Sequence, residues 1–232
     1  DGEQTLDSLV ARGDLSQTLE GIAEDASSQD RFFAGSELVD IDTEDLLARI
    51  DAGLSALGIT AATADDLKPV DEFHTGGVKA TEALLSRLEI SPEMRVLDIG
   101  CGLGGTARYI AQQYGAHVTG LDLTPVFVAV GQALNARVQL DQKIDLQVGS
   151  ALDLPVQDAS CDLVTMLHVG MNIPDKAAVF REIARVLKAG GQAAIVVGGQ
   201  EVRGITLAPA YFGVKGGGAR MGHSYRNIVS AD

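Results

Sequence analysis

Residues 95–105 constrain the fold of this chain more than any other stretch, because an apolar run leads directly into a glycine-rich turn. Glycine occupies four of the six positions from 100 to 105. A residue without a Cβ lets the backbone bend tightly and approach a ligand closely. The helix expected after the turn adds unpaired N–H groups and the positive end of its dipole. The stretch therefore predicts a strand that ends at a nucleotide-type binding site.

Expected strands and helices alternate through the middle of the chain. The strands are residues 94–99, 117–122, 144–149, 162–167 and 192–198. The helices are residues 104–114, 125–137 and 176–188. Thr124 and Pro125 favour the start of the second helix, and Gly190 and Gly191 the end of the third. This alternation predicts the α/β class, with a doubly wound, mainly parallel sheet covered by helices on both faces.

Composition divides the chain into three parts. Residues 1–70 hold 16 acidic and 4 basic side chains, and residues 43–57 have the apolar spacing of an amphipathic helix. We expect this acidic helical extension to act as a lid or as a dimer contact. Residues 71–199 form the predicted binding core. Residues 200–232 are predicted to be a glycine-rich, irregular tail that leaves room only for a short or incomplete C-terminal hairpin.

Charge and cysteine content argue against several classes of protein. A net charge of −14 disfavours nucleic acid as a partner, because phosphates would be repelled. Cys101 and Cys161 have no His or Cys at metal spacing, which indicates neither a metal site nor a disulfide framework. No stretch has the length of a membrane span, and the first residues do not resemble a signal peptide. We expect a cytoplasmic protein that can form a homodimer.

Two acidic residues point to the kind of ligand. Asp98 precedes the first glycine of the turn by two residues, and Asp122 closes the next strand. In open parallel sheets, ligands bind beyond the carboxyl ends of the strands. Asp98 and the turn would hold an amino acid group, and Asp122 would accept two ribose hydroxyls, which favours S-adenosylmethionine. The predicted cofactor-binding residues are Asp98, Gly100, Gly102, Gly104, Asp122, Leu123, Ser150, Ala151 and Leu152.

Two other functions remain open at this point. Glycines at 100, 102 and 105, with Asp122 seventeen residues further on, also fit the Gly-x-Gly-x-x-Gly pattern of an NAD(P)-dependent oxidoreductase. Against that reading, Asp98 would face a pyrophosphate, and nearly a hundred residues precede the turn. The unusual tail also permits a non-catalytic protein that binds S-adenosylmethionine without turnover.

Five segments of residues 70–199 resemble a known family. They are VLDIGCGLGG at 96–105, VTGLDLTP at 118–125, DLP at 153–155, HVGMNI at 168–173 and RVLKAGG at 185–191. Together they resemble class I S-adenosylmethionine-dependent methyltransferases of the group that contains sarcosine/dimethylglycine and UbiE-type enzymes. The resemblance implies a Rossmann-like methyltransferase fold and methyl transfer to a small molecule. The resemblance implies first a small amine such as sarcosine or dimethylglycine as the methyl acceptor, and next a quinone-type ring precursor or a specialised metabolite.

The same resemblance suggests where the acceptor meets the donor. Residues 71–77 resemble the entry segment that packs over the bound donor, so Phe73 and His74 are expected near it. Ser150 replaces an Asp that many relatives carry, and the chain after residue 197 departs from the usual ending.

Methyl transfer from a sulfonium needs alignment more than acid–base chemistry. An acceptor that must lose a proton nevertheless needs a base, and His168, at the end of the fourth strand, is the candidate. A histidine that only caps the strand is an equally good reading. Met171 and Asn172 would shape the acceptor wall, although plain packing also explains Met171.

Overall fold

The computed structural model describes residues 43–72, 74, 77–197, 200–206 and 214–215. The predictions for residues 1–42 and for most of the tail lie outside these ranges, and so does Phe73. No helix in the described part of the chain combines the length and the apolar character needed to cross a membrane.

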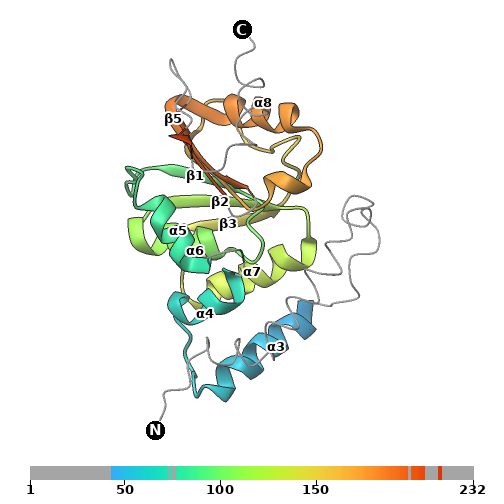
Figure 1. Ribbon diagram of the computed structural model, residues 1–232. Helices are drawn as coiled ribbons and strands as arrows, with labels where there is room; N and C mark the ends of the chain where they lie inside the picture. Colours follow the sequence, from blue (N-terminus) through green and yellow to red (C-terminus); the bar gives the residue numbers. More distant parts are fainter. Residues whose placement is uncertain (1–42, 73, 75–76, 198–199, 207–213, 216–232) are drawn as a thin grey trace.

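A seven-stranded sheet with the order β3-β2-β1-β4-β5-β6-β7 forms the centre of the molecule (Figure 1). Its strands are β1 (Arg95–Ile99), β2 (His117–Asp122), β3 (Ile144–Val148), β4 (Cys161–Leu167), β5 (Leu187–Val197), β6 (Gln200–Thr206) and β7 (Val214–Lys215). The first five strands are parallel, and the last two are antiparallel. The chain winds outward from β1 to β3 and then crosses to β4 on the other side of β1. The strand order therefore reverses between β1 and β4, which confirms the predicted doubly wound fold.

Helices cover both faces of this sheet (Figure 1). They are α3 (Thr43–Ala56), α4 (Ala64–Asp71), α5 (Gly77–Leu85), α6 (Gly105–Tyr114), α7 (Pro125–Arg137) and α8 (Lys176–Val186). Side chains of α5, α6 and α7 pack on one face, and those of α8 pack on the other. Central strands are buried on both faces, as the burial of six of the seven residues of β4 shows.

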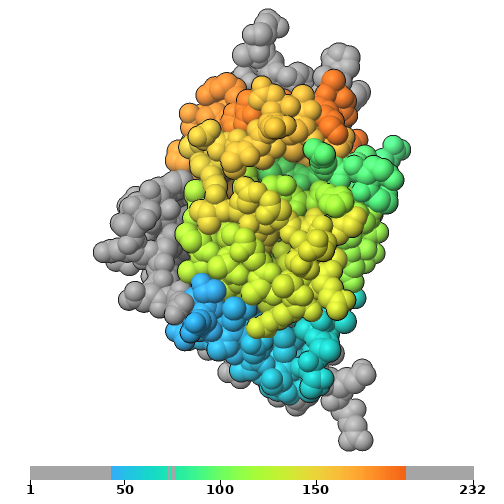
Figure 2. Space-filling view, turned by 180° about the vertical axis from the view of Figure 1, so that it is seen from behind, coloured from blue at the N-terminus to red at the C-terminus, as the bar shows by residue number. Residues whose placement is uncertain are grey.

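The predicted amphipathic helix at residues 43–57 corresponds to α3. Its buried residues Leu46, Ile50 and Leu54 share a hydrophobic cluster with Val130 and Leu134 of α7. Seen from behind in Figure 2, α3 (blue) lies at the end of the molecule opposite the orange surface of α8. Burial of this apolar stripe on α7 gives the helix most of its stability.

Helix α4 was not expected from the sequence. It begins at a capping box in which Thr63 Oγ1 accepts from the Asp66 N–H and the Asp66 carboxylate accepts from the Thr63 N–H. Pro69 lies inside this helix of 8 residues. The proline and the short length hide the helical periodicity, so only the capping pattern could have revealed α4.

The prediction that the third helix ends at residue 188 was wrong. Helix α8 ends at Val186, and Leu187 already pairs with Cys161 of β4. The register then shifts, so that Leu163 pairs with Gln192, and Gly190 has φ +82° in the irregular part of β5. Pairing with β4 ends the helix before the glycines do. Within the described residues, β7 has only 2 residues, in line with the predicted short C-terminal hairpin.

Candidate functional site

Asp98 is a buried carboxyl at the point where the strand order reverses. It lies beside Thr165 of β4, and its side chain accepts at Oδ1 from Thr165 Oγ1 over 2.6 Å. Its other oxygen, Oδ2, is buried and has no hydrogen-bond partner within the described residues. The pKa of Asp98 is raised to about 7, chiefly by burial and also by the charges of Glu72 and Asp122, while the Thr165 hydrogen bond acts to lower it. An incompletely partnered buried carboxylate marks a candidate functional site.

Asp122 ties the glycine-rich turn to the end of β2. Its Oδ2 accepts from the Gly102 N–H and its Oδ1 from the Thr124 N–H, both over 2.9 Å. Gly102 has φ +53°, and a Cβ there would meet nothing within 4 Å. The turn therefore needs glycine for its backbone conformation and leaves open space beside it. Each carboxylate oxygen of Asp122 keeps a second lone pair for a ligand hydroxyl.

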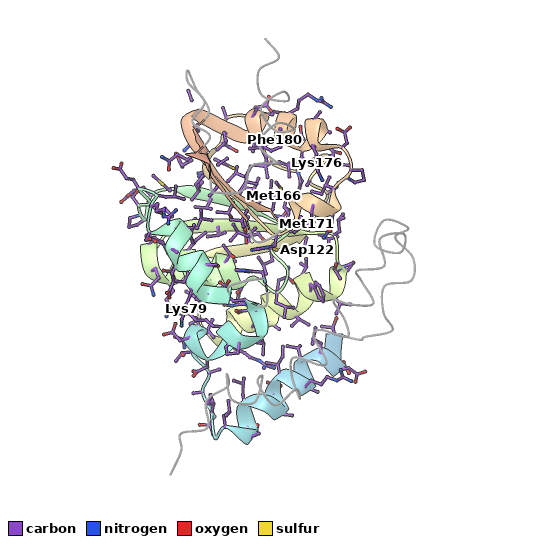
Figure 3. All side chains as sticks on the ribbon, in the orientation of Figure 1. Lys79, Asp122, Met166, Met171, Lys176 and Phe180 are labelled. Carbon is purple, nitrogen blue, oxygen red and sulfur yellow. The ribbon has the colours of Figure 1, made fainter. Side chains whose placement is uncertain are left out.

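Large apolar side chains are exposed around these acids. Leu123 is 54% exposed, Val148 53%, Leu152 44% and Met171 43%. All four lie at or just after the carboxyl ends of β2, β3 and β4. Figure 3 labels Asp122 and Met171 at this same edge of the sheet. Apolar exposure gathered at one edge, next to a few polar groups, is typical of a site for a small ligand.

The loop after β3 places the other predicted adenine contacts at this edge. The Ser150 hydroxyl accepts from the Leu152 N–H over 3.1 Å, and Ser150 bridges to Asp153. Ser150 therefore shapes a turn that exposes Leu152, with Ala151 half-buried between them.

His168 and His74 meet over this edge although 94 positions separate them. Their rings are stacked, with centroids 4.7 Å apart and an interplanar angle of 15°. His168 has φ +58°, an uncommon conformation for a residue with a Cβ, and its N–H donates to the Val196 carbonyl. Burial, together with the neighbouring His74, lowers the pKa of His168 below 6.5. At neutral pH the His168 imidazole is therefore uncharged and can accept a proton.

Glu72 is a site residue that the sequence analysis missed. It is 5% exposed, and its Oε2 accepts from Thr81 Oγ1 and contacts His74 Nε2, both over 2.8 Å. Its Oε1 is buried without a hydrogen-bond partner among the described residues. The signal was available, because an acid two positions before a histidine stood within the entry segment already singled out.

A buried ion pair holds the end of α4 next to the turn. Arg108 donates from Nε and Nη2 to Asp71 Oδ2, over 3.0 and 2.5 Å, and from Nη2 to the Leu103 carbonyl. Its Nη1 also donates to Asn135 Oδ1 of α7. A Cβ on Gly105 would lie 2.5 Å from the Asp71 carbonyl oxygen, so glycine is required where α4 meets α6. Arg108 thereby links α4, the turn and α7.

The short helix η1 (Gly170–Asn172) carries the two predicted acceptor-wall residues, Met171 and Asn172, both exposed. Lys176 Nζ donates to the carbonyls of Gly170, Met171 and Ile173. The ammonium of Lys176 therefore fixes the backbone that presents Met171 and Asn172.

Cys101 and Cys161 are buried, and burial raises the pKa of both thiols. They are packing residues rather than nucleophiles at neutral pH. Within the described ranges, no three His, Cys, Asp or Glu residues are arranged to hold a metal ion.

Known proteins of similar sequence are methyltransferases. A family described as a methyltransferase domain matches residues 97–195. The chloroplastic tocopherol O-methyltransferase of Arabidopsis thaliana is 41% identical over 102 residues, which are 44% of this chain and 29% of the relative. The glycine/sarcosine/dimethylglycine N-methyltransferase of Actinopolyspora halophila is 36% identical over 123 residues, which are 53% of this chain and 22% of the relative. The chain thus spans less than a third of the length of these curated relatives.

A solved structure gives the same result for the fold. A candidate sarcosine dimethylglycine methyltransferase from Galdieria sulphuraria superposes with a TM-score of 0.51 at 32% identity, over 52% of this chain and 46% of that one. The match agrees with the predicted Rossmann-like core. Residues 97–195 therefore match a methyltransferase domain, and the core of this chain is similar in sequence and in fold to known methyltransferases.

Proposed function

We propose that this protein transfers a methyl group from S-adenosylmethionine to a small-molecule acceptor. One observation carries the proposal: Asp98 and Asp122 lie at the ends of neighbouring strands on either side of the glycine-rich turn, and Asp98 keeps a buried, unpartnered oxygen. The ammonium of an amino acid group satisfies that oxygen, whereas the pyrophosphate of a dinucleotide would be repelled by Asp98. The site therefore favours the sulfonium donor over NAD(P).

Each part of the donor has a matching group in the site. Asp98 and the backbone of Gly100, Gly102 and Gly104 face its amino acid part, and Asp122 accepts from the ribose hydroxyls. The exposed side chains of Leu123 and Leu152 would cover the adenine, with Ser150 and Ala151 at its edge. Removing these apolar surfaces from water contributes about 25 cal/mol per Å² to binding.

His168 is the proposed general base. When bound, the donor supplies a methyl group activated by its positively charged sulfur. The uncharged His168 imidazole takes the proton from a protonated amine or a hydroxyl of the acceptor and so frees the lone pair that attacks the methyl carbon. The bond between that carbon and sulfur then breaks, and the donor leaves as the neutral thioether S-adenosylhomocysteine. His74 stacks on His168 and restricts its orientation. Met171 and Asn172 form the wall against which the acceptor is positioned.

A small amine such as sarcosine or dimethylglycine is the leading acceptor. Support comes from the Actinopolyspora halophila and Galdieria sulphuraria proteins, whose names carry these amines. Because one relative is a tocopherol O-methyltransferase, a ring hydroxyl of the phenol type is the second acceptor class to test on this protein.

The predictions on cellular location, on binding partners and on oligomeric state are part of this proposal. Two buried cysteines without a disulfide are compatible with the reducing cytoplasm that the sequence predicts, although one relative is chloroplastic. The acidic charge of −14 supports the prediction that nucleic acid is not a partner. A homodimer through residues 1–70 remains a prediction from their composition.

Calorimetric titration with S-adenosylmethionine, with NADH as the comparison ligand, tests the donor. We expect binding of S-adenosylmethionine only, and binding of NADH alone would refute the proposal. Incubation with labelled donor and with sarcosine, dimethylglycine and simple phenols then tests turnover. Donor binding without label transfer to any of them would favour a non-catalytic binding protein.

A further inference from the structure

Glu72 and Asp98 are held in the same way. Each carboxylate accepts a hydrogen bond at one oxygen from a buried threonine hydroxyl. Thr81 donates to Glu72 and Thr165 donates to Asp98, and both threonines are 0% exposed. Each keeps its second oxygen buried and without a hydrogen-bond partner among the described residues, Oε1 in Glu72 and Oδ2 in Asp98. Two elements far apart in the sequence therefore present one unsatisfied carboxylate oxygen each.

The two carboxylates lie at the same edge of the sheet, because Glu72 contacts His74 and the His74 ring stacks on His168, three residues after the Thr165 that holds Asp98. The charge of Glu72 helps to raise the pKa of Asp98, and His74, which contacts Glu72, acts in the opposite direction on the same group. None of the described lysine or arginine side chains forms an ion pair with Glu72 or Asp98. Two neighbouring anions in a buried site, without a permanent cation, are strongly destabilising unless a cation is bound.

We propose that Glu72 and Asp98 together bind the ammonium group of the methyl donor, with Glu72 as a second carboxylate supplied by the segment between α4 and α5. The inference rests on the proposed function and adds a residue to the donor site. The charges match, because the donor carries an ammonium and a sulfonium next to its single carboxylate. An ammonium has three N–H donors, enough for one oxygen of each side chain and a third acceptor.

The fold around Glu72 supports this role. Thr81 and His74 fix the Oε2 atom, so the direction of Oε1 is set before a ligand arrives. The preceding residue, Asp71, is anchored by the buried guanidinium of Arg108. Glu72 is therefore a preorganised group, and binding the ammonium orders few additional side chains.

The test compares two ligands that differ only in the amine. They are S-adenosylhomocysteine and 5′-S-(3-carboxypropyl)-5′-thioadenosine, the analogue with hydrogen in place of the α-amine. Affinities for both are measured by calorimetry at pH 8, where Asp98 is ionised, on the full chain and on Glu72→Gln. Glutamine keeps the size of the side chain and an oxygen that can accept from Thr81. The exposed Glu89, changed to Gln, serves as the matched control.

We expect Glu72→Gln to lower the affinity for S-adenosylhomocysteine about 10- to 100-fold, which is the usual effect of losing a hydrogen bond to a charged group. The affinity for the deaminated analogue should change less than about threefold, and Glu89→Gln should alter neither ligand. Unchanged affinity for S-adenosylhomocysteine in Glu72→Gln overturns the inference and leaves the proposed function standing. Equal losses for both ligands overturn it as well, because Glu72 would then only support the structure. If the unmodified protein binds neither ligand, the proposed function falls together with the inference.

Discussion

Two consecutive buried acids, Asp71 and Glu72, have opposite surroundings. Asp71 pairs with the guanidinium of Arg108, and both side chains are 2% exposed. Glu72 has a threonine hydroxyl and an imidazole instead, and each of the two acids keeps one buried oxygen without a hydrogen-bond partner among the described residues. The chain supplies an arginine where a buried acid joins three helices, whereas no lysine or arginine of the described residues pairs with the acid that faces the site. The difference separates a group that stabilises the fold from a group that awaits a ligand.

The pKa of Asp71 shows how strongly this region is desolvated. Burial raises it to about 6, even though Arg108 acts to lower it. The ion pair therefore offsets only part of the desolvation, which is usual for buried pairs. Its contribution is to fix the position of α4 relative to α6.

The largest effect should follow from removing the structural cation. Arg108→Met leaves Asp71 buried without a counter-charge, and we expect the free energy of unfolding to fall by about 3–5 kcal/mol. Urea denaturation followed by circular dichroism measures this loss. The double variant Arg108→Met/Asp71→Leu should recover most of it, because neither charge is then buried. If the free energy of unfolding of Arg108→Met lay within about 0.5 kcal/mol of that of the unmodified protein, the contrast between Asp71 and Glu72 would be refuted.

Removing the proposed base should affect turnover and leave stability nearly unchanged. His168→Ala is expected to lower kcat about 100- to 1,000-fold, with the donor affinity kept within about threefold. In the unmodified protein, the rate should fall only at pH values below 6.5, because burial lowers the pKa of His168 from that value. Steady-state kinetics and calorimetry on the same samples separate the two quantities. A parallel loss of rate and donor affinity would assign His168 to donor binding or to structure.

Asp122 combines the roles that Asp71 and Glu72 divide. Asp122→Ala should lower the affinity for S-adenosylmethionine about 30- to 100-fold, because two contacts to the ribose hydroxyls are lost and the turn loses the hydrogen bond from the Gly102 N–H. Titration calorimetry measures the affinity, and the exposed Asp141→Ala is the control. Unaltered donor affinity in Asp122→Ala would show that this carboxylate serves the turn alone.

The last prediction concerns the pH dependence of stability. The pKa of Asp98 is raised from 3.8 to about 7, so the folded protein binds one more proton than the unfolded chain between these values. This contribution is present below about pH 4 and is lost as the pH rises to about 7. Without ligand, Asp98→Asn should therefore melt at the same temperature at pH 4 and at a higher temperature at pH 8, by about 2–4 °C for each kcal/mol of stability that ionisation of Asp98 removes. A constant difference at all pH values, measured by calorimetric melting, would show that Asp98 is ionised with a partner in the free protein.

The order of strands and helices could be predicted because burial leaves a local signature. A strand such as β1, buried in four of its five residues, appears as a short apolar run followed by a glycine turn. The positions of Asp98, Asp122 and His168 at strand ends follow from the same pattern. Helix α4 escaped because 8 residues containing a proline show too little periodicity.

Contacts between distant residues could not be predicted in the same way. Arg108 lies on α6, and nothing local indicates that it is buried against Asp71, which is 37 positions earlier. Glu72 and His74 stood in the singled-out segment, but their contacts with Thr81 and His168 depend on how α4 and α5 pack on the sheet. Charged side chains are usually solvated, so a sequence does not reveal a buried one.

The sequence by itself determined the alternating α/β fold, the glycine-rich turn and the two acids at the ends of β1 and β2, since apolar periodicity and missing Cβ atoms act over a few residues. Only the tertiary structure decided which buried acid received a cation. That outcome depends on burial and on charges brought together by packing, because a carboxylate's environment is set by its neighbours in space rather than along the chain.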